Sequence, residues 1–270
     1  AADVGVSASA LSQGLAELER RIGVELFERA GRRRLVRDAA RPVVDHAHQV
    51  LALTGDLVAW RDRLRDGVTG AVRLGMIDVA AVVHFPDVLR GFRAVHPEVD
   101  VSLVVAPSRT LVDAVRTGDL DLVVCVEPPG HVDDLHLASL LSEPLAVFAP
   151  PGELPSRPAA DWGPWVLFPS GSHTRGQVEA ALTAAGATID VAAESHQPDV
   201  IREMVRLGLG WTVLPRSQVD TTPGTAGDGL VAGPELLRRR LVLARRRGAI
   251  HDPVVELLAR RLRAQPGDDA

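Results

Sequence analysis

The segment from position 6 to position 37 constrains the fold of this chain more than any other. Apolar residues recur in it every three or four positions: Leu11, Leu15, Leu18 and Ile22. This spacing places them on one face of an α-helix, and Ser7 stands where its hydroxyl would cap the helix N-terminus. Four arginines then lie between positions 29 and 34. The segment is therefore expected to form a helix followed by a basic β-turn.

Taken one at a time, these pieces would fit an amphipathic helix followed by a solvated arginine turn. Their order favours a DNA-binding head. The run VSxSALSxxLxxLExxIGVxLFER, followed by GRR, resembles the winged helix-turn-helix of the LysR-type transcriptional regulators. The resemblance implies that the helix over 7–21 lies in the major groove and that the arginine turn is a wing on the flanking backbone.

The resemblance also assigns DNA contacts to individual residues. Base edges would face Ser9, Ser12 and Gln13. Phosphates would lie near Ser7, Arg29, Arg32, Arg33 and Arg34. Phosphate contacts would give affinity and register, and base-edge contacts would give sequence choice. The chain starts inside the family pattern, so we expect a partial winged helix-turn-helix over residues 1–39.

Composition and net charge narrow the classes of protein to which the chain could belong. There is no run of eighteen apolar residues and no basic start followed by an apolar core, so neither a spanning helix, a membrane partner nor a signal peptide is expected. The single cysteine, Cys125, excludes an internal disulfide and favours the cytoplasm; no metal site or cofactor is expected. The net charge is −5, but residues 1–41 carry eight arginines against six acidic residues, a local balance of +2.

A heptad pattern follows the head, over residues 40–67. Its positions alternate spacings of four and three: Val43, Ala47, Val50, Thr54, Leu57, Arg61 and Leu64. The pattern is typical of a buried amphipathic helix or of a coiled coil. We favour a linker helix that dimerises the protein, because it joins a DNA-reading head to the rest of the chain.

Alternating apolar strands and amphipathic helices fill the rest of the sequence. In the first unit we expect strands over 71–77, 99–105 and 120–126, with helices over 85–95 and 109–117. In the second we expect strands over 165–168, 188–193 and 209–215, with helices over 174–185 and 198–207. A loop over 224–233, a strand over 241–248 and a helix from 253 to about 264 complete the chain. This order predicts βαβ units with parallel sheets.

Two such lobes joined by two crossovers resemble the periplasmic-binding-protein-like (type 2) effector domain of the same family. The matching runs are RLGMI, FPDVLRGFRAVHPEVDVSLV, RTGDLDLVV, LFPSGSHTR and VRLGLGWTVLPRS. The resemblance implies an α/β effector domain over 70–265, with lobe I at about 70–144 and 238–265 and lobe II at about 145–237. The alternative is a solute-binding protein of this fold without DNA-binding activity. The head and the heptad helix favour the regulator.

Ligands of such folds bind outside the carboxyl ends of the strands, where the lobes face each other. Residues 170–175, SGSHTR, lead small hydroxyl side chains directly into a helix, which suits an anion or a helix cap alone. The resemblance implies that Ser172 and Thr174 hold the polar group of the effector. The facing loops would contribute Asp78, Ser108, His196 and Gln197, while Arg109, His173 and Arg175 would add positive charge for a carboxylate or an aromatic effector.

No catalytic motif stands out. The sequence has no Gly-x-Ser-x-Gly elbow, no phosphate-binding Gly-Lys-Ser/Thr loop and no His-Glu-x-x-His. We therefore predict an allosteric regulator rather than an enzyme, acting as a homodimer or homotetramer on a palindromic double-stranded promoter site, with RNA polymerase as a further expected partner. A small-molecule effector would close the lobes and change the spacing of the heads.

Overall fold

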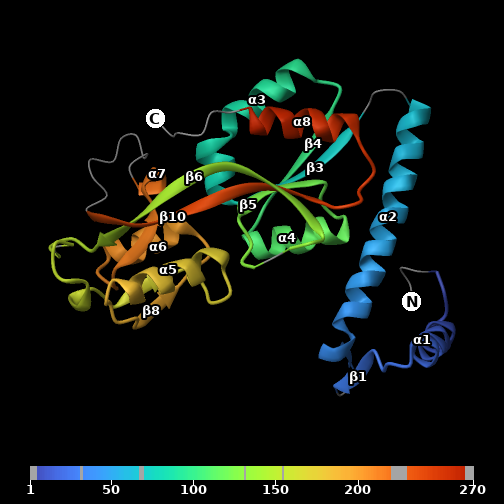
Figure 1. Cartoon of the computed structure of the whole chain (residues 1–270), viewed down its shortest axis with the longest axis horizontal. Helices are drawn as coiled ribbons and strands as arrows, with labels where there is room; N and C mark the ends of the chain where they lie inside the picture. The colour runs from blue at the N-terminus through green and yellow to red at the C-terminus, as the bar shows by residue number, and fades with distance from the viewer. Residues whose placement is uncertain are drawn as a thin grey trace.

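The computed structural model describes residues 5–30, 33–66, 70–130, 132–153, 155–219 and 230–264, and the side chains at these positions except 29, 30, 33, 56, 59, 60 and 62–66. A small head and a long helix stand beside a two-lobed α/β body (Figure 1). Among the described residues, no helix combines the length and the apolar composition needed to cross a membrane.

The head contains the predicted helix and wing. Helix α1 (Ala8–Ile22) is capped by Ser7, whose Oγ accepts from the backbone N–H of Ala10 at 3.2 Å, and it ends at Gly23, whose φ of 73° is a left-handed conformation that suits glycine. Strands β1 (Phe27–Ala30) and β2 (Arg33–Val36) pair as an antiparallel hairpin. The Glu19 carboxylate accepts from the backbone N–H groups of Leu26 and Phe27, and so attaches the wing to the helix.

Helix α2 (Arg41–Asp66) follows a short 3-10 turn, η2 (Asp38–Ala40). Its bounds agree with the helix expected from the heptad pattern. Much of its apolar surface is exposed: Val50, Leu51, Leu53, Leu57 and Val58. Ala52 differs from them, because it is buried against the body of the protein.

Lobe I is built on the parallel strands β3 (Ala71–Met76), β4 (Asp100–Val105) and β5 (Leu122–Val126). Helix α4 (Ser108–Thr117) covers one face of the sheet, while α3 (Pro86–Val95) and α8 (Pro253–Arg263) cover the other (Figure 1). Every residue of β5 is buried, which agrees with its continuous apolar sequence. A π-helical turn, η3 (Ala80–His84), leads into α3.

Two long antiparallel strands, β6 (Leu135–Ala149) and β10 (Val231–Arg246), run through both lobes. They make one six-stranded sheet of order β4-β3-β5-β10-β6-β9, in which β9 is Thr212–Pro215. The chain therefore crosses from lobe I to lobe II along β6, which begins at Leu135. It returns along β10, which begins at Val231 and not at the predicted position 241. The predicted loop over 224–233 is wrong at 231–233, which belong to β10, and residues 220–229 lie outside the described residues.

Lobe II adds a second small sheet, of β7 (Trp165–Leu167) and β8 (Val191–Glu194), which are parallel and joined to β9 by a bridge between Trp165 and Trp211. A short 3-10 turn, η4 (Ala159–Asp161), precedes them. Helices α5 (His173–Ala184) and α6 (Pro198–Arg206) pack on opposite faces, and α7 (Arg216–Val219) follows β9. The strands are shorter than expected from the sequence, but the βαβ order is confirmed.

Candidate effector site between the lobes

The N-terminus of α5 faces lobe I. Gly171 has a φ of 84° and turns the chain so that Ser172 stands at the N-cap position, although the Ser172 hydroxyl makes no capping hydrogen bond. The exposed Arg109 of α4 lies against this turn, because a Cβ built on Gly171 would be 3.2 Å from its Nη1. A guanidinium of lobe I therefore lies beside the positive end of a helix of lobe II.

His173 also bridges the lobes. Its Nδ1 lies 3.2 Å from the carbonyl oxygen of Val126 at the end of β5. A carbonyl can only accept, so Nδ1 carries the proton. Burial lowers the pKa of His173, and the nearby charge of Arg109 acts in the same direction. The imidazole is thus expected to be neutral and to act as a donor at neutral pH.

Thr174 is buried beside these residues and has a charged neighbour that the sequence did not point to. Its Oγ1 accepts a hydrogen bond of 2.8 Å from Nη1 of Arg239, on β10. Because a guanidinium has only donors, the threonine oxygen is the acceptor in this bond. The bond with Arg239 therefore does not use the hydroxyl proton of Thr174.

Arg239 forms a buried ion pair with Glu143 of β6, at 2.8 Å. The other oxygen of Glu143 accepts from Nε2 of His84 at 2.8 Å and from the hydroxyl of Ser217 at 3.0 Å. Burial by itself would raise the pKa of Glu143, but the charge of Arg239 and the hydrogen bond from His84 outweigh it and lower the pKa to about 2. Both lobes thus contact one ion pair, lobe I through His84 and lobe II through Ser217 and Thr174.

Asp78 and Ser108 lie at the carboxyl ends of lobe I strands, as predicted. The Asp78 carboxylate accepts from the Gln218 side chain at 2.9 Å, which is a direct contact between the lobes. Burial raises the pKa of Asp78, with the hydrogen bonds from Val79 and Gln218 acting against it. The Ser108 hydroxyl accepts from the backbone N–H of Val126 at 3.1 Å, and so fixes the start of α4 to the end of β5.

The remaining predicted residues of lobe II lie apart from this group. Arg175 is buried within lobe II, where its guanidinium donates to the Phe168 carbonyl and to the carboxylates of Glu179 and Glu194. His196 and Gln197 are exposed; Gln197 is the N-cap of α6, and its backbone N–H donates to Ser195. Among the described residues, no hydrogen bond that we identify joins these three side chains to Thr174 or Asp78.

Five residues of the inter-lobe network were not predicted: His84, Glu143, Ser217, Gln218 and Arg239. One signal was available in the sequence. Glu143 interrupts the apolar run LLSEPLAVF, and Arg239 stands two positions before LVLA. Each is therefore a charged residue next to a stretch of strand that is apolar enough to be buried. A charge in such a position needs a partner, and each of these two supplies it for the other.

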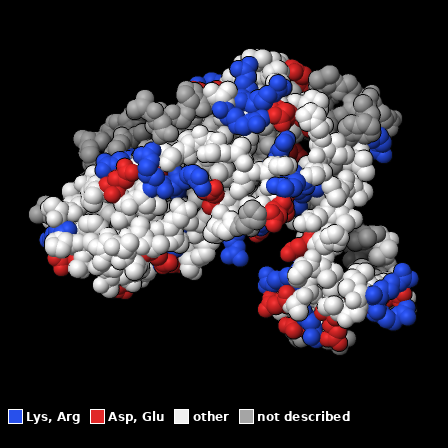
Figure 2. All heavy atoms as spheres, in the orientation of Figure 1, with Lys and Arg blue, Asp and Glu red and all other residues white. Residues whose placement is uncertain are grey.

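The predicted DNA-contacting residues lie on one helix and one hairpin. Ser9, Ser12 and Gln13 are exposed on α1, and the hydroxyls of Ser7 and Ser9 are 3.0 Å apart. Arg34 is exposed on β2. Arg32 lies outside the described residues, as do the side chains of Arg29 and Arg33. Basic and acidic side chains are interspersed over the described part of the head (Figure 2).

A DNA-reading head, a linker helix and a two-lobed sensor define a class of ligand-controlled transcriptional regulators. Comparisons with known families agree with this class. The family described as LysR substrate binding domain matches residues 65–267, and the family described as bacterial regulatory helix-turn-helix protein, lysR family, matches residues 1–39. The chain belongs to the LysR family of transcriptional regulators. The helix-turn-helix match favours this function over that of a solute-binding protein.

Curated relatives lead to the same family. A probable hydrogen peroxide-inducible genes activator of Streptomyces viridosporus is 32% identical over 278 residues, which cover 97% of this chain and 87% of the relative. The HTH-type transcriptional regulator IlvR of Caulobacter vibrioides is 30% identical over 223 residues, covering 79% of this chain and 75% of IlvR. Both are named as regulators of genes rather than as enzymes.

Solved structures support the fold. Full-length OxyR from Pseudomonas aeruginosa matches with a TM-score of 0.64 at 24% identity, covering 96% of this chain and 86% of OxyR. The effector binding domain of QuiR in complex with shikimate matches with a TM-score of 0.63 at 14% identity, covering 72% and 95%. At these identities the likeness concerns the fold alone.

Proposed function

We propose that this regulator senses a small effector that presents a hydrogen-bond acceptor, in the first place a carboxylate, to Thr174 between the two lobes. The observation that carries this proposal is the bond from Arg239 to Thr174. The threonine oxygen already uses one lone pair on a guanidinium, so its hydroxyl proton is the group that can be offered to a ligand acceptor. A ligand ammonium would instead have to share the same oxygen with the positively charged guanidinium of Arg239, and the two like charges repel each other.

The charges around the site support an anion. The charged Arg109 and the positive end of α5 meet at the turn formed by Gly171 and Ser172, while the neutral His173 adds no charge. An anion at a helix N-terminus is favoured by the free N–H groups and by the helix dipole. We assign the ligand's polar end to Ser172 and Thr174, with Asp78 and Ser108 on the facing loops and Arg175, His196 and Gln197 at the periphery.

For the DNA-binding end, we propose that a homodimer or a dimer of dimers presents paired α1 helices to a palindromic site in the cytoplasm. The exposed apolar residues of α2 support self-association, because a lone helix of this length would leave them in water. Half-sites one DNA turn apart, about 34 Å, or a multiple of that would fit such a dimer. RNA polymerase is the expected further partner.

We also propose the division into a head over 1–39, a linker over 40–67 and an effector domain over 70–265, with the lobes meeting at β6 and β10. The cleft is assigned to binding rather than catalysis, since the named relatives are transcriptional regulators. Ligand binding would then change the packing of subunits and the spacing of the heads.

The test is thermal unfolding of the whole chain with matched pairs of probes: benzoate against benzylamine, and glutarate against pentane-1,5-diamine. A ligand that binds only the folded state raises the unfolding midpoint. We expect shifts with carboxylates only. Thr174→Val, which removes the hydroxyl proton, should weaken binding by about tenfold or more, roughly 1.4 kcal/mol, whereas Thr174→Ser should retain it. A shift with the amines alone, or equal binding by Thr174→Val, would contradict the proposal.

A further inference from the structure

Helix α4 has one end where the two lobes meet and the other end beside the linker helix. At its start, Ser108 is fixed to Val126 and Arg109 lies against Gly171 of lobe II. Its middle is anchored in the core by Leu111, Val112 and Val115, all of them buried. A helix with such an apolar face moves as a rigid unit more readily than it bends.

The far end of α4 packs against α2, and the approach at Gly118 is very close. Gly118 ends the helix with a φ of 78°, and a Cβ built on it would lie 2.6 Å from the Cβ of Ala52. No side chain larger than hydrogen therefore fits at position 118 while Ala52 stays in place. Ala52 is 8% exposed, whereas its neighbours Leu51 and Leu53 are 68% and 42% exposed.

This contact lies between two cavities. One, of about 510 Å³, is lined by Leu51, Ala52 and Gly55 of α2, by the turn over 117–121 and by the segment over 248–252. The other, of about 560 Å³, is lined by Asp45, His48 and Gln49 of α2, and by residues of α4 together with Asp134. The packing between α2 and lobe I is thus tight at one point and open on both sides of it.

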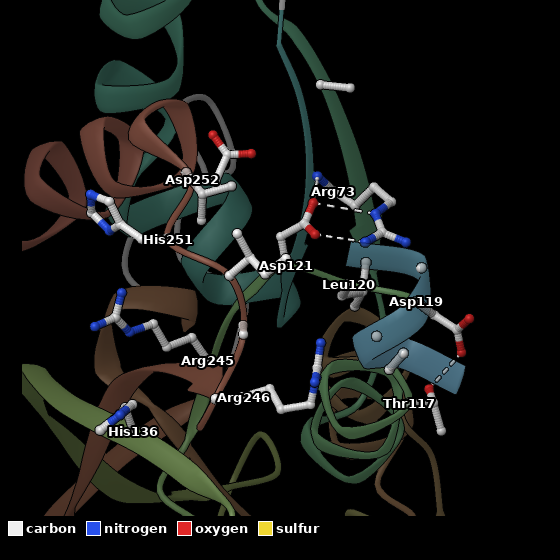
Figure 3. Close-up of a pocket in the computed structure, with 18 of the residues that line it drawn as sticks. Arg73, Thr117, Asp119, Leu120, Asp121, His136, Arg245, Arg246, His251 and Asp252 are labelled. Carbon is white, nitrogen blue, oxygen red and sulfur yellow. Dashed lines mark hydrogen bonds and ion pairs between the residues drawn. The ribbon is translucent and has the colours of Figure 1, made fainter. Parts of the chain in front are cut away.

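Several polar groups around the first cavity are paired within lobe I. Figure 3 shows Arg73 paired with Asp121, and Thr117 hydrogen-bonded to Asp119, on the side of the cavity nearest α2. Arg245 pairs with Glu256 on the far side. The close packing of Ala52 on Gly118 lies beside these pairs and holds the linker helix against the lobe.

We propose that the contact between Ala52 and Gly118 is a docking point for the linker helix, and that α4 transmits changes at the cleft to α2 through it. The docking itself needs no ligand. The transmission rests on the proposed effector site, since the cleft end of α4 carries Ser108 and Arg109. A tight contact with open space beside it can be broken and remade without disturbing either core, as a reversible coupling requires.

The first experiment tests the docking by hydrogen exchange of the whole chain, followed at the backbone amides of residues 45–58. Gly118→Ala is compared with Gly130→Ala, because both glycines have a φ of 78° but nothing lies within 4 Å of a Cβ at Gly130. We expect exchange over 45–58 to become about tenfold faster in Gly118→Ala and to stay unchanged in Gly130→Ala.

Removing the opposing methyl group provides a rescue. The double variant Ala52→Gly/Gly118→Ala should exchange over 45–58 at the same rate as Ala52→Gly alone. The single variant Ala52→Gly is the reference, because a glycine in α2 by itself lowers helix propensity. Amides of β3 and β5 report in the same spectra whether lobe I remains folded. Equal exchange in Gly118→Ala and Gly130→Ala, or no rescue by Ala52→Gly, would overturn the docking point.

The second experiment tests transmission without any ligand. Ser108→Ala removes the hydroxyl that accepts from Val126, at the cleft end of α4. Ser195→Ala removes another hydroxyl that accepts from a backbone N–H at 3.1 Å, in an exposed turn of lobe II. Faster exchange over 45–58 in Ser108→Ala, but not in Ser195→Ala, is the expected result. If neither variant changes exchange there, α4 does not transmit. A failure of effector binding in the thermal assay would leave these results unaffected, so the two proposals fail separately.

Discussion

Glu143 and Arg239 lie directly opposite each other on the neighbouring strands β6 and β10, joined at 2.8 Å with only 1% and 4% of their side chains exposed. Because these two strands run through both lobes, the ion pair lies where the lobes meet. His84, Ser217 and Thr174 then bind to it from either side. A buried charge without its partner is strongly unfavourable, so this pair has large consequences for stability.

Glu143→Gln is expected to destabilise the protein by about 3–5 kcal/mol, because it leaves the guanidinium of Arg239 buried and uncompensated. Urea unfolding followed by circular dichroism measures the change. Glu127→Gln is the matched control, since Glu127 pairs with the adjacent Arg240 at 2.6 Å in a more exposed position. That variant should lose less than about 1 kcal/mol. Similar losses in the two variants would show that burial is not the deciding factor.

Acid should weaken the protein through the same carboxyl group. The pKa of Glu143 is lowered from 4.5 to about 2 in the folded state, so between these values the unfolded chain binds the proton more tightly. The contribution of Glu143 is therefore fully present above pH 4.5 and is lost as the pH falls towards 2. Unfolding free energies measured from pH 6 to pH 2 should decline more steeply in the wild-type protein than in Glu143→Gln, and parallel declines would contradict this assignment.

Gly171→Ala should disturb the cleft beyond the cost of its backbone conformation. Gly171 and Gly186 have φ values of 84° and 85°, but only at Gly171 would a Cβ meet another side chain, Nη1 of Arg109 at 3.2 Å. Each substitution is expected to cost about 1 kcal/mol of folding stability for the left-handed backbone. Binding of benzoate in the thermal assay should fall further in Gly171→Ala alone, because Arg109 must move, and equal binding in both variants would remove Arg109 from the site.

Arg34→Ala should weaken DNA binding without regard to sequence. An arginine that neutralises one phosphate contributes about 0.9 to the slope of log K against log salt. Fluorescence anisotropy with a mixed-sequence duplex over a range of salt concentrations measures that slope. Arg90→Ala is the control, since Arg90 lies on α3 of the effector domain and pairs with Asp87. Equal slopes for both variants would show that the wing does not contact phosphates.

The sequence was informative where local patterns decide the structure. The spacing of Leu11, Leu15, Leu18 and Ile22 and the serine cap predicted α1. The apolar run over 120–126, interrupted only by Asp121, predicted β5. The whole of β6 and the start of β10 were missed as strands for a physical reason. Their buried polar residues pair across strands that are separated by more than eighty positions in the chain, and no short window contains both partners.

In the candidate site too, features set by local sequence could be predicted, whereas contacts between distant residues could not. The turn over 170–175 could be found from its composition alone, because hydroxyl residues before a helix have a local signature. That Thr174 accepts from Arg239, or that His173 reaches the carbonyl of Val126, depends on how the lobes are packed. Arg175 shows why local sequence is not enough. It is a basic residue in the predicted turn, but its guanidinium donates to the Phe168 carbonyl and to Glu194 within lobe II.

The pairing of Ala149 with Val231 has a consequence for how such proteins diversify. The end of β6 and the start of β10 are direct neighbours in the sheet. Everything between them is therefore an insertion into a hairpin that begins in lobe I and extends into lobe II. Recombination at these two points would exchange half of the sensing surface in one event, while the head, the linker helix and the contact that joins them to lobe I are inherited unchanged.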